Sequence, residues 1–272
     1  NVLTMKEILS DALFSKFADF FYSKTGIKLK EYKKYLIINR LSKFIGSDKK
    51  YLTFKDFYDA LVSTDDPDFI NSFVNAITTN FSFFFRERVH FDFLRYFFSK
   101  FDFKNNYARI WSAACSTGEE TYSAAISVLQ TVDNLANYDF KILGTDISTR
   151  VLSDAERGGY NADKLDSNVD KRLLKTYFDK VNNNYIVKDF VKKFIDFRYL
   201  NLMKSYPFTR EFDIVFLRNV LIYFDPGEKE YIINRIYPYV KKGGYLILGL
   251  SETLLGIKHN FKTLKYSIYK KE

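Results

Sequence analysis

The sequence predicts an α/β protein with a doubly wound, mostly parallel sheet, preceded by a small all-α domain. From Tyr107 onward four apolar runs alternate with helical segments, and each run has the length of a strand buried on both faces: RIWSAAC, KILGTDI, FDIVFL and YLILGL. The first 80 residues show only helical periodicity. We therefore divide the chain into a helical domain (1–80), a linker and lid (81–106) and an α/β domain (107–272).

The amino-terminal domain shows four helical segments. The first covers residues 14–22 and stops at Thr25-Gly26. Two later segments, 54–62 and 69–77, are separated by a turn or N-cap cluster at residues 64–67. The second segment lies between them and carries an apolar face made of Ile37, Ile38, Leu41, Phe44 and Ile45.

The α/β domain contains an insertion and an antiparallel ending. Residues 157–197 interrupt the alternation with a helical stretch over 169–178, followed by a hairpin that turns at Asn182-Asn183-Asn184. The carboxyl-terminal segment HNFKTLKYSIYKK suits an edge hairpin. We therefore expect a small antiparallel β insertion and an antiparallel last strand on the main sheet.

Composition indicates a protein with a full core and no membrane insertion. The chain has 272 residues, 47% of them hydrophobic, and a single cysteine that cannot form an internal disulfide. No apolar run approaches the roughly 20 residues that span a bilayer. These features predict a cytoplasmic location.

The formal net charge of +9 is partly concentrated in one segment. Eight basic residues against two acidic ones lie between Lys28 and Lys50. On the second helical segment, Lys33, Arg40 and Lys43 fall within one arc opposite the apolar face, which predicts an exposed positive stripe. Such charge is typical of proteins that bind nucleic acid, anionic membranes or acidic proteins, and also of a solvated surface.

Polar residues follow the predicted strands at the edge where ligands bind in such sheets. A run of small residues, 112–118, links the first strand to a helix that begins with Glu119 and Glu120. Asp146 ends the second strand, where nucleotide-binding folds place an acid that accepts hydrogen bonds from ribose hydroxyls. An N-cap for the helix near Ser148 is the alternative role for Asp146. Arg218 and Asn219 follow the run FDIVFL directly.

The polar residues described above lie within or beside four motifs, which occur along the chain in this order: TTNFSFFFRE from Thr78, WSAACSTGEETYS from Trp111, GTDIS from Gly144 and FLRNVLIYFD from Phe216. Together they resemble the CheR family of chemotaxis methyltransferases, which transfer a methyl group from S-adenosylmethionine to receptor glutamates. The resemblance covers nearly the whole chain. It implies a class I methyltransferase fold, S-adenosylmethionine as cofactor and S-adenosylhomocysteine as product.

The resemblance also implies a set of site residues. In the linker and lid, Arg86 would pair with the cofactor carboxylate, with an interdomain salt bridge as the alternative. Arg86 and Tyr223 would line the methyl channel, although Tyr223 also suits a core or surface role. Glu120 is favoured over Glu119 for facing the positive amino-acid part of the cofactor, with helix capping as the alternative. The cofactor-binding set that the family pattern implies is Asn80, Ser82, Arg86, Glu120, Asp146, Asn201, Leu202, Arg218 and Asn219.

The implied reaction needs no covalent nucleophile and no acid or base. A glutamate with an ordinary pKa of about 4.3 is already ionised at neutral pH, so catalysis would come from alignment and desolvation. No His and Cys set has metal-ligand spacing, so we expect no metal. His90 and His259 are interpreted as surface or structural, and Cys115 as a packing residue beside the cofactor.

The implied partner is the helical cytoplasmic region of chemoreceptors, contacted through Lys33, Arg40 and Lys43. Some family members also grip a receptor-tail peptide on the insertion, but the short turn here has no glycine, which argues against tail binding. We expect a monomer. A nucleic-acid methyltransferase or binding protein is one alternative, although the chain has neither an Asn/Asp-Pro-Pro-aromatic motif nor a Pro-Cys nucleophile. A noncatalytic signalling module that binds the cofactor is the other.

Overall fold

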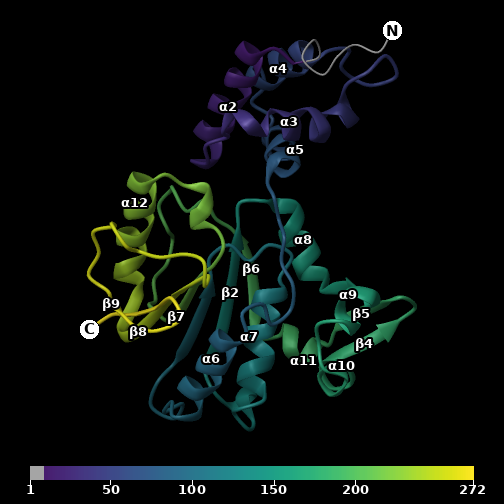
Figure 1. The fold of residues 1–272 in the computed structure, drawn as a ribbon. Helices are drawn as coiled ribbons and strands as arrows, with labels where there is room; N and C mark the ends of the chain where they lie inside the picture. Colours follow the sequence, from purple (N-terminus) through teal and green to yellow (C-terminus); the bar gives the residue numbers. More distant parts are fainter. Residues whose placement is uncertain (1–8) are drawn as a thin grey trace. The chain divides into compact units, whose positions relative to one another are not determined.

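A computed structural model describes residues 9–272 (Figure 1). The chain folds as two compact units, which are described separately. The first comprises residues 9–79 together with 223–225, and the second comprises residues 80–222 and 226–272. Residues 81–106, expected as a linker and lid, belong with Asn80 to the second unit, where helix α6 (Val89–Ser99) packs against α7 (Glu119–Leu129).

The first unit is helical. Its helices are α2 (Asp11–Thr25), α3 (Lys34–Leu41), α4 (Phe54–Val62) and α5 (Pro67–Ile77), with 3-10 turns η1 (Glu31–Lys33) and η2 (Ser42–Phe44) beside α3. The predicted stop at Gly26 and the predicted cap at Asp66 are confirmed, since Gly26 adopts a left-handed conformation and Asp66 accepts a hydrogen bond from Asp68 N. Buried rings of Phe17, Phe57 and Phe73 form the centre of the core.

The basic segment differs from the expected uniform stripe. Helix α3 ends at Leu41, not at Ile45, and the chain continues as η2. Arg40 is half-buried, and its guanidinium donates to carbonyl oxygens at the end of α5, including Ile77 O at 2.8 Å. A cation at the free carbonyls of a helix end is a favourable cap. The expectation of an exposed stripe is therefore wrong for Arg40, because helical periodicity alone does not reveal a neighbouring helix end.

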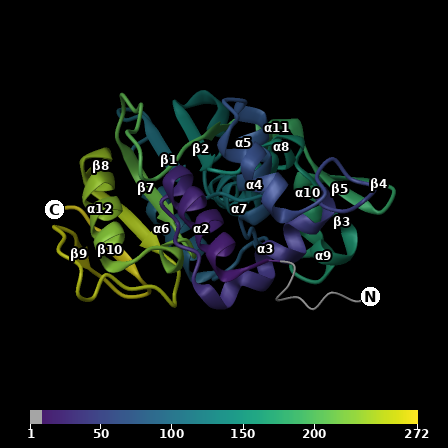
Figure 2. The same ribbon diagram turned by 90° about the horizontal axis from the view of Figure 1, so that it is seen from above.

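The second unit is built on a seven-stranded sheet in the order β6-β2-β1-β7-β8-β10-β9. Strands β1 (Ala108–Ser112), β2 (Phe140–Asp146), β6 (Ile195–Tyr199), β7 (Phe212–Leu217) and β8 (Val240–Leu248) are parallel. Strands β9 (Lys262–Thr263) and β10 (Ile268–Lys270) are antiparallel, as the sequence predicted for the ending. Figure 2 shows this ending at one end of the unit and the insertion at the other.

Helices and one small sheet complete the second unit. Helix α7 and helix α8 (Thr149–Arg157) pack against β2 and β6, and α12 (Pro226–Ile236) precedes β8. The insertion forms the predicted antiparallel sheet, in the order β3-β5-β4, from β3 (Gly159–Asn161), β4 (Phe178–Val181) and β5 (Asn184–Val187). Helices α9 (Ala162–Asp166) and α10 (Lys171–Tyr177) connect β3 to β4, and α11 (Asp189–Lys192) leads from β5 to β6. Asn182, with a φ of +53°, forms the predicted hairpin turn.

Candidate active site

The turn after β1 brings a buried carboxylate from β2 against the start of α7. Gly118, the N-cap of α7, has a φ of +93°, and a Cβ there would lie 2.9 Å from the Ala155 Cβ. The carboxylate of Asp146 accepts from Ser116 N and from Ser148 N, each at 2.9 Å. Burial raises the pKa of Asp146, and these backbone donors oppose the increase. Asp146 thus holds the end of β2 to the turn, whereas Ser148 itself caps α8.

Glu119 and Glu120 point to different partners. The Glu119 carboxylate accepts from Thr117 Oγ1 at 2.7 Å. The two Glu120 oxygens accept from Ser112 Oγ at 2.6 Å and from Arg218 Nη1 at 2.8 Å, so Glu120 faces the carboxyl ends of β1 and β7.

Arg218 is the centre of a buried ion-pair network. Its side chain is only 1% exposed, and besides Glu120 it contacts Glu87 Oε2 at 3.2 Å and donates to the backbone oxygen of Arg86. Burial alone would raise the pKa of Glu87, but the Arg218 guanidinium and the Leu250 N–H hold it below its usual range. Glu87 ends the motif TTNFSFFFRE, but its role in this network depends on contacts with Arg218 and Leu250, which are distant in the chain.

Five further predicted residues lie beside Asp146 or on the segment before α6. Leu200 N donates to Asp146 O at 3.0 Å, which places the buried Asn201 and Leu202 next to the end of β2. Arg86 is half-buried; its guanidinium lies over the Phe81 and Phe83 rings and donates to Phe81 O. Asn80 and Ser82 are half-buried on the same segment.

Tyr223 is placed differently from the other predicted residues. It ends the 3-10 turn η4 (Leu221–Tyr223) and is half-buried. It groups with the first unit, where Lys33 Nζ lies 5.4 Å from the centroid of its ring. Lys33 is itself half-buried, so of the three predicted stripe residues Lys43 alone is exposed.

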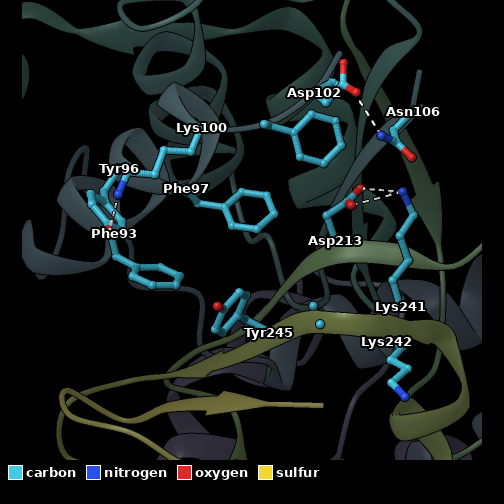
Figure 3. Close-up of a pocket in the computed structure, with 13 residues that line it drawn as sticks. Phe93, Tyr96, Phe97, Lys100, Asp102, Asn106, Asp213, Lys241, Lys242 and Tyr245 are labelled. Carbon is cyan, nitrogen blue, oxygen red and sulfur yellow. Dashed lines mark hydrogen bonds and ion pairs between the residues drawn. The ribbon is translucent and has the colours of Figure 1, made fainter. Parts of the chain in front are cut away.

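The hollow drawn in Figure 3 lies at the edge of the sheet where β7 and β8 begin, opposite the edge that carries Asp146, Glu120 and Arg218. It measures about 470 Å³ and is lined by aromatic rings of α6 and β8 and by the ion pair of Asp213 with Lys241. Lys241 Nζ already donates to both Asp213 oxygens and to Tyr107 O, and Asp213 accepts from Arg109 N as well. Both members of this ion pair are hydrogen-bonded within the protein and hold together the beginnings of β1, β7 and β8, so the pair supports the sheet.

The other edge of the sheet, where β1, β2 and β7 have their carboxyl ends, instead fits a polar nucleoside ligand. We call it the carboxyl edge. It combines two carboxylates, a guanidinium and a turn of small residues at a helix start. Ser116 Oγ and Arg218 Nε are buried and have no hydrogen-bond partner within residues 9–272. Because buried polar atoms are normally paired, a bound ligand with polar groups would complete this edge.

Comparison with known families identifies the chain. Residues 80–270 match the CheR methyltransferase, SAM binding domain, and residues 12–78 match the CheR methyltransferase, all-alpha domain. The chain belongs to the CheR methyltransferase family. The expected family, the methyltransferase fold and S-adenosylmethionine as cofactor are thereby confirmed.

Relatives of this CheR-family chain are similar over almost their whole length. A chemotaxis protein methyltransferase of Borreliella burgdorferi is 37% identical, over 92% of this chain and 90% of the relative. A probable chemotaxis protein methyltransferase of Rhizobium etli is also 37% identical, over 92% and 96%. The chemotaxis protein methyltransferase of Escherichia coli is 32% identical, over 98% and 93%. None of the helices described in residues 9–272 has the length and hydropathy of a membrane span.

His90 of the CheR-family site is buried and neutral, not at the surface. Its Nε2 lies 2.8 Å from Tyr266 O, which can only accept, so Nε2 carries the hydrogen. Nδ1 lies 3.5 Å from Glu87 Oε2. Burial and the nearby Arg218 lower the pKa of His90 from 6.5 to about 4.

The low pKa of His90 predicts that the folded protein becomes less stable in acid. Between pH 6.5 and 4 the unfolded chain binds a proton at His90 that the folded chain does not, so stability is full above pH 6.5 and falls as the pH is lowered. We expect the wild-type protein to lose about 2 kcal/mol more than His90→Gln between pH 7 and 4.5. Urea unfolding at the two pH values measures this difference. Equal losses in both proteins would contradict the assignment.

Proposed function

We propose that this enzyme transfers the methyl group of S-adenosylmethionine to glutamate side chains of chemoreceptors, and that it does so in the cytoplasm. The observation that carries the proposal is the match of both parts of the chain, residues 12–78 and 80–270, to the CheR family, whose relatives are named chemotaxis protein methyltransferases. Family membership does not favour a nucleic-acid substrate. The basic charge is instead suited to an acidic protein partner.

The proposed cofactor site is the carboxyl edge of β1, β2 and β7. Asp146 would hold the ribose hydroxyls, and Glu120 would face the ammonium group while its other contacts keep it oriented. Arg218 and Asn219 border the site from β7. The remaining proposed contacts are Asn80, Ser82, Arg86, Asn201 and Leu202. Arg86 and Tyr223 stay the proposed channel residues.

S-adenosylmethionine, when bound, supplies a methyl group on a positively charged sulfur that is already activated for transfer. A receptor glutamate is ionised at neutral pH, so the protein needs no base to activate it. The buried carboxylates, the Arg218 network and the turn after β1 would hold the reacting groups in line and exclude water. Cys115 takes no part as a nucleophile, because burial raises the pKa of its thiol well above the usual value.

A labelling experiment tests the function. The protein is incubated with methyl-labelled S-adenosylmethionine and a cytoplasmic receptor fragment, and then with a control fragment in which the acceptor glutamates are alanine. The proposal predicts label on glutamate that alkali releases as methanol, and none on the control fragment. Alkali-stable label, or transfer to nucleic acid in place of the receptor, would reject it.

We propose that the receptor is recognised by the basic segment of the first unit, residues 28–50. In this segment Lys43 is exposed and Lys33 is half-buried. Electrostatic attraction would act chiefly on encounter and orientation. We expect Lys33→Glu/Lys43→Glu to raise the apparent KM for receptor and to leave affinity for S-adenosylhomocysteine unchanged. The effect should shrink with added salt, since exposed charges are screened beyond about 8–10 Å near physiological ionic strength.

The control for charge alone is Lys258→Glu/Lys265→Glu, which reverses two exposed lysines outside the basic segment. This double variant should methylate receptor with a nearly unchanged KM. If both double variants raised the KM equally, net charge and not the basic segment would control recognition. Arg40 is left intact, because reversing it would remove the cap on α5.

A further inference from the structure

A buried carboxylate outside the predicted set holds the backbone of the loop after β7. Glu252 is 6% exposed and lies in the turn that follows β8. Its Oε2 accepts from Asn219 N at 2.6 Å and from Gly249 N at 2.9 Å, and its Oε1 accepts from Leu221 N at 2.9 Å. The N–H of Ile222 also contributes. One side chain therefore accepts from three backbone N–H groups of the loop after β7.

The main chain of Glu252 is fixed independently of that loop. Its N–H donates to Gly249 O at 2.8 Å, and its carbonyl accepts from Ser267 Oγ at 3.0 Å. Ser267 O in turn accepts from Leu248 N. The carboxyl-terminal strands thus anchor the carboxylate, and the carboxylate determines where the loop lies.

The backbone of the loop turns left-handed at Asn219. Asn219 has a φ of +57°, a conformation that asparagine adopts more readily than most residues, and the Glu252 carboxylate accepts from its N–H in that conformation. Gly249 gives the Asn219 side chain its space, since a Cβ on Gly249 would lie 2.5 Å from Asn219 Nδ2 and 3.0 Å from Glu252 Oε2. Glu252 and Gly249 therefore fix the backbone and the side chain of Asn219 together.

The same turn is also connected to the Arg218 network. Leu250 N donates to Glu87 Oε2 at 3.0 Å, and that oxygen also contacts Arg218. Two carboxylates that contact the turn after β8 thus hold adjacent residues of the site: Glu87, which accepts from Leu250 N, holds the Arg218 guanidinium, and the buried Glu252 holds the Asn219 backbone.

We propose that Glu252 is a positioning residue for methyl transfer, which keeps Asn219 and the loop after it in the conformation that receives the cofactor. This inference rests on the proposed function only in assigning Asn219 to the cofactor site. A carboxylate suits the task because both of its oxygens accept, whereas a glutamine of the same size must present an NH2 group to one set of the N–H donors.

The test compares Glu252→Gln with a matched control, Asp213→Asn. Asp213 is also a buried carboxylate that accepts a backbone N–H, but it lies at the opposite edge of the sheet with Lys241 (Figure 3). Both variants should have lowered melting temperatures. Affinity for S-adenosylhomocysteine is then measured by calorimetry well below the melting temperature of each protein, and kcat and KM are measured with receptor fragment.

We expect Glu252→Gln to weaken S-adenosylhomocysteine binding by about tenfold or more and to lower kcat/KM by about 100-fold, as small misplacements of a site residue do. Asp213→Asn should keep wild-type affinity and kcat. Wild-type affinity and kcat in a destabilised Glu252→Gln protein would overturn the proposal and leave Glu252 a stabilising residue only.

A second variant covers the case in which Glu252→Gln does not fold. Gly249→Ala crowds Asn219 and Glu252 without changing any charge, and it should weaken S-adenosylhomocysteine binding in the same direction. Normal affinity in Gly249→Ala would overturn the proposal. The calorimetry needs no acceptor, so these outcomes stand even if the receptor proves not to be the substrate.

Discussion

Arg218→Gln is expected to lower the free energy of unfolding of the second unit by about 3–5 kcal/mol, the usual effect of removing one partner of a buried ion pair. The substitution leaves Glu87 and Glu120, which are 16% and 13% exposed at the side chain, without their shared cation. Both carboxylates would then repel each other or take up protons. Urea unfolding at pH 7 measures the change.

An exposed arginine provides the comparison. Arg210 pairs with Asp139 where both side chains are more than half exposed, so Arg210→Gln should cost less than about 1 kcal/mol. A similar decrease in the free energy of unfolding for the two variants would show that the Arg218 network stabilises the protein little more than a surface ion pair does. The Arg218 variant should also bind S-adenosylhomocysteine more weakly, whereas the Arg210 variant should not.

Asp146→Asn is expected to weaken S-adenosylhomocysteine binding by about 1.5–3 kcal/mol, the range for a lost hydrogen bond to a charged group. The amide keeps one acceptor oxygen for Ser116 N or Ser148 N, so the turn after β1 should stay folded. Calorimetry measures the affinity, and a thermal melt reports whether the fold is kept.

Ser148→Ala serves as the control beside Asp146. It removes the hydroxyl that accepts from Val151 N at the start of α8, which should cost about 1 kcal/mol of stability without altering the affinity for S-adenosylhomocysteine. If Asp146→Asn likewise affected only stability, Asp146 would be a link between β2 and the turn after β1, and the ribose would have to bind elsewhere.

Local patterns predicted most of the fold. The strand FDIVFL is buried at every position and coincides with β7, because a parallel strand covered on both faces must be apolar throughout. Asn182 marks the hairpin of the insertion because asparagine tolerates a positive φ. The apolar periodicity continues through Phe44 and Ile45 although helix α3 ends at Leu41, so the pattern alone does not mark the end of the helix.

The candidate site was predicted only where motifs carry it. Asp146 and Arg218 follow strands, so their edge of the sheet can be deduced from the sequence. His90 and Glu252 have no such signal, because each is buried by partners more than 30 residues away, Tyr266 for His90 and Asn219 for Glu252. Glu87 ends the motif TTNFSFFFRE, but its ion pair with Arg218 joins residues far apart in the chain. Arg40 illustrates the converse, since a residue with the pattern of a docking cation instead caps a neighbouring helix.

The central claim is that S-adenosylmethionine binds at the carboxyl edge of β1, β2 and β7. A crystal structure of the protein with S-adenosylhomocysteine tests it most directly. The account predicts the ribose against Asp146 and the amino-acid portion toward Glu120 and Arg218. Ligand density at the opposite edge, in the hollow between α6 and β8, or density that leaves Asp146 without a ligand contact, would contradict it.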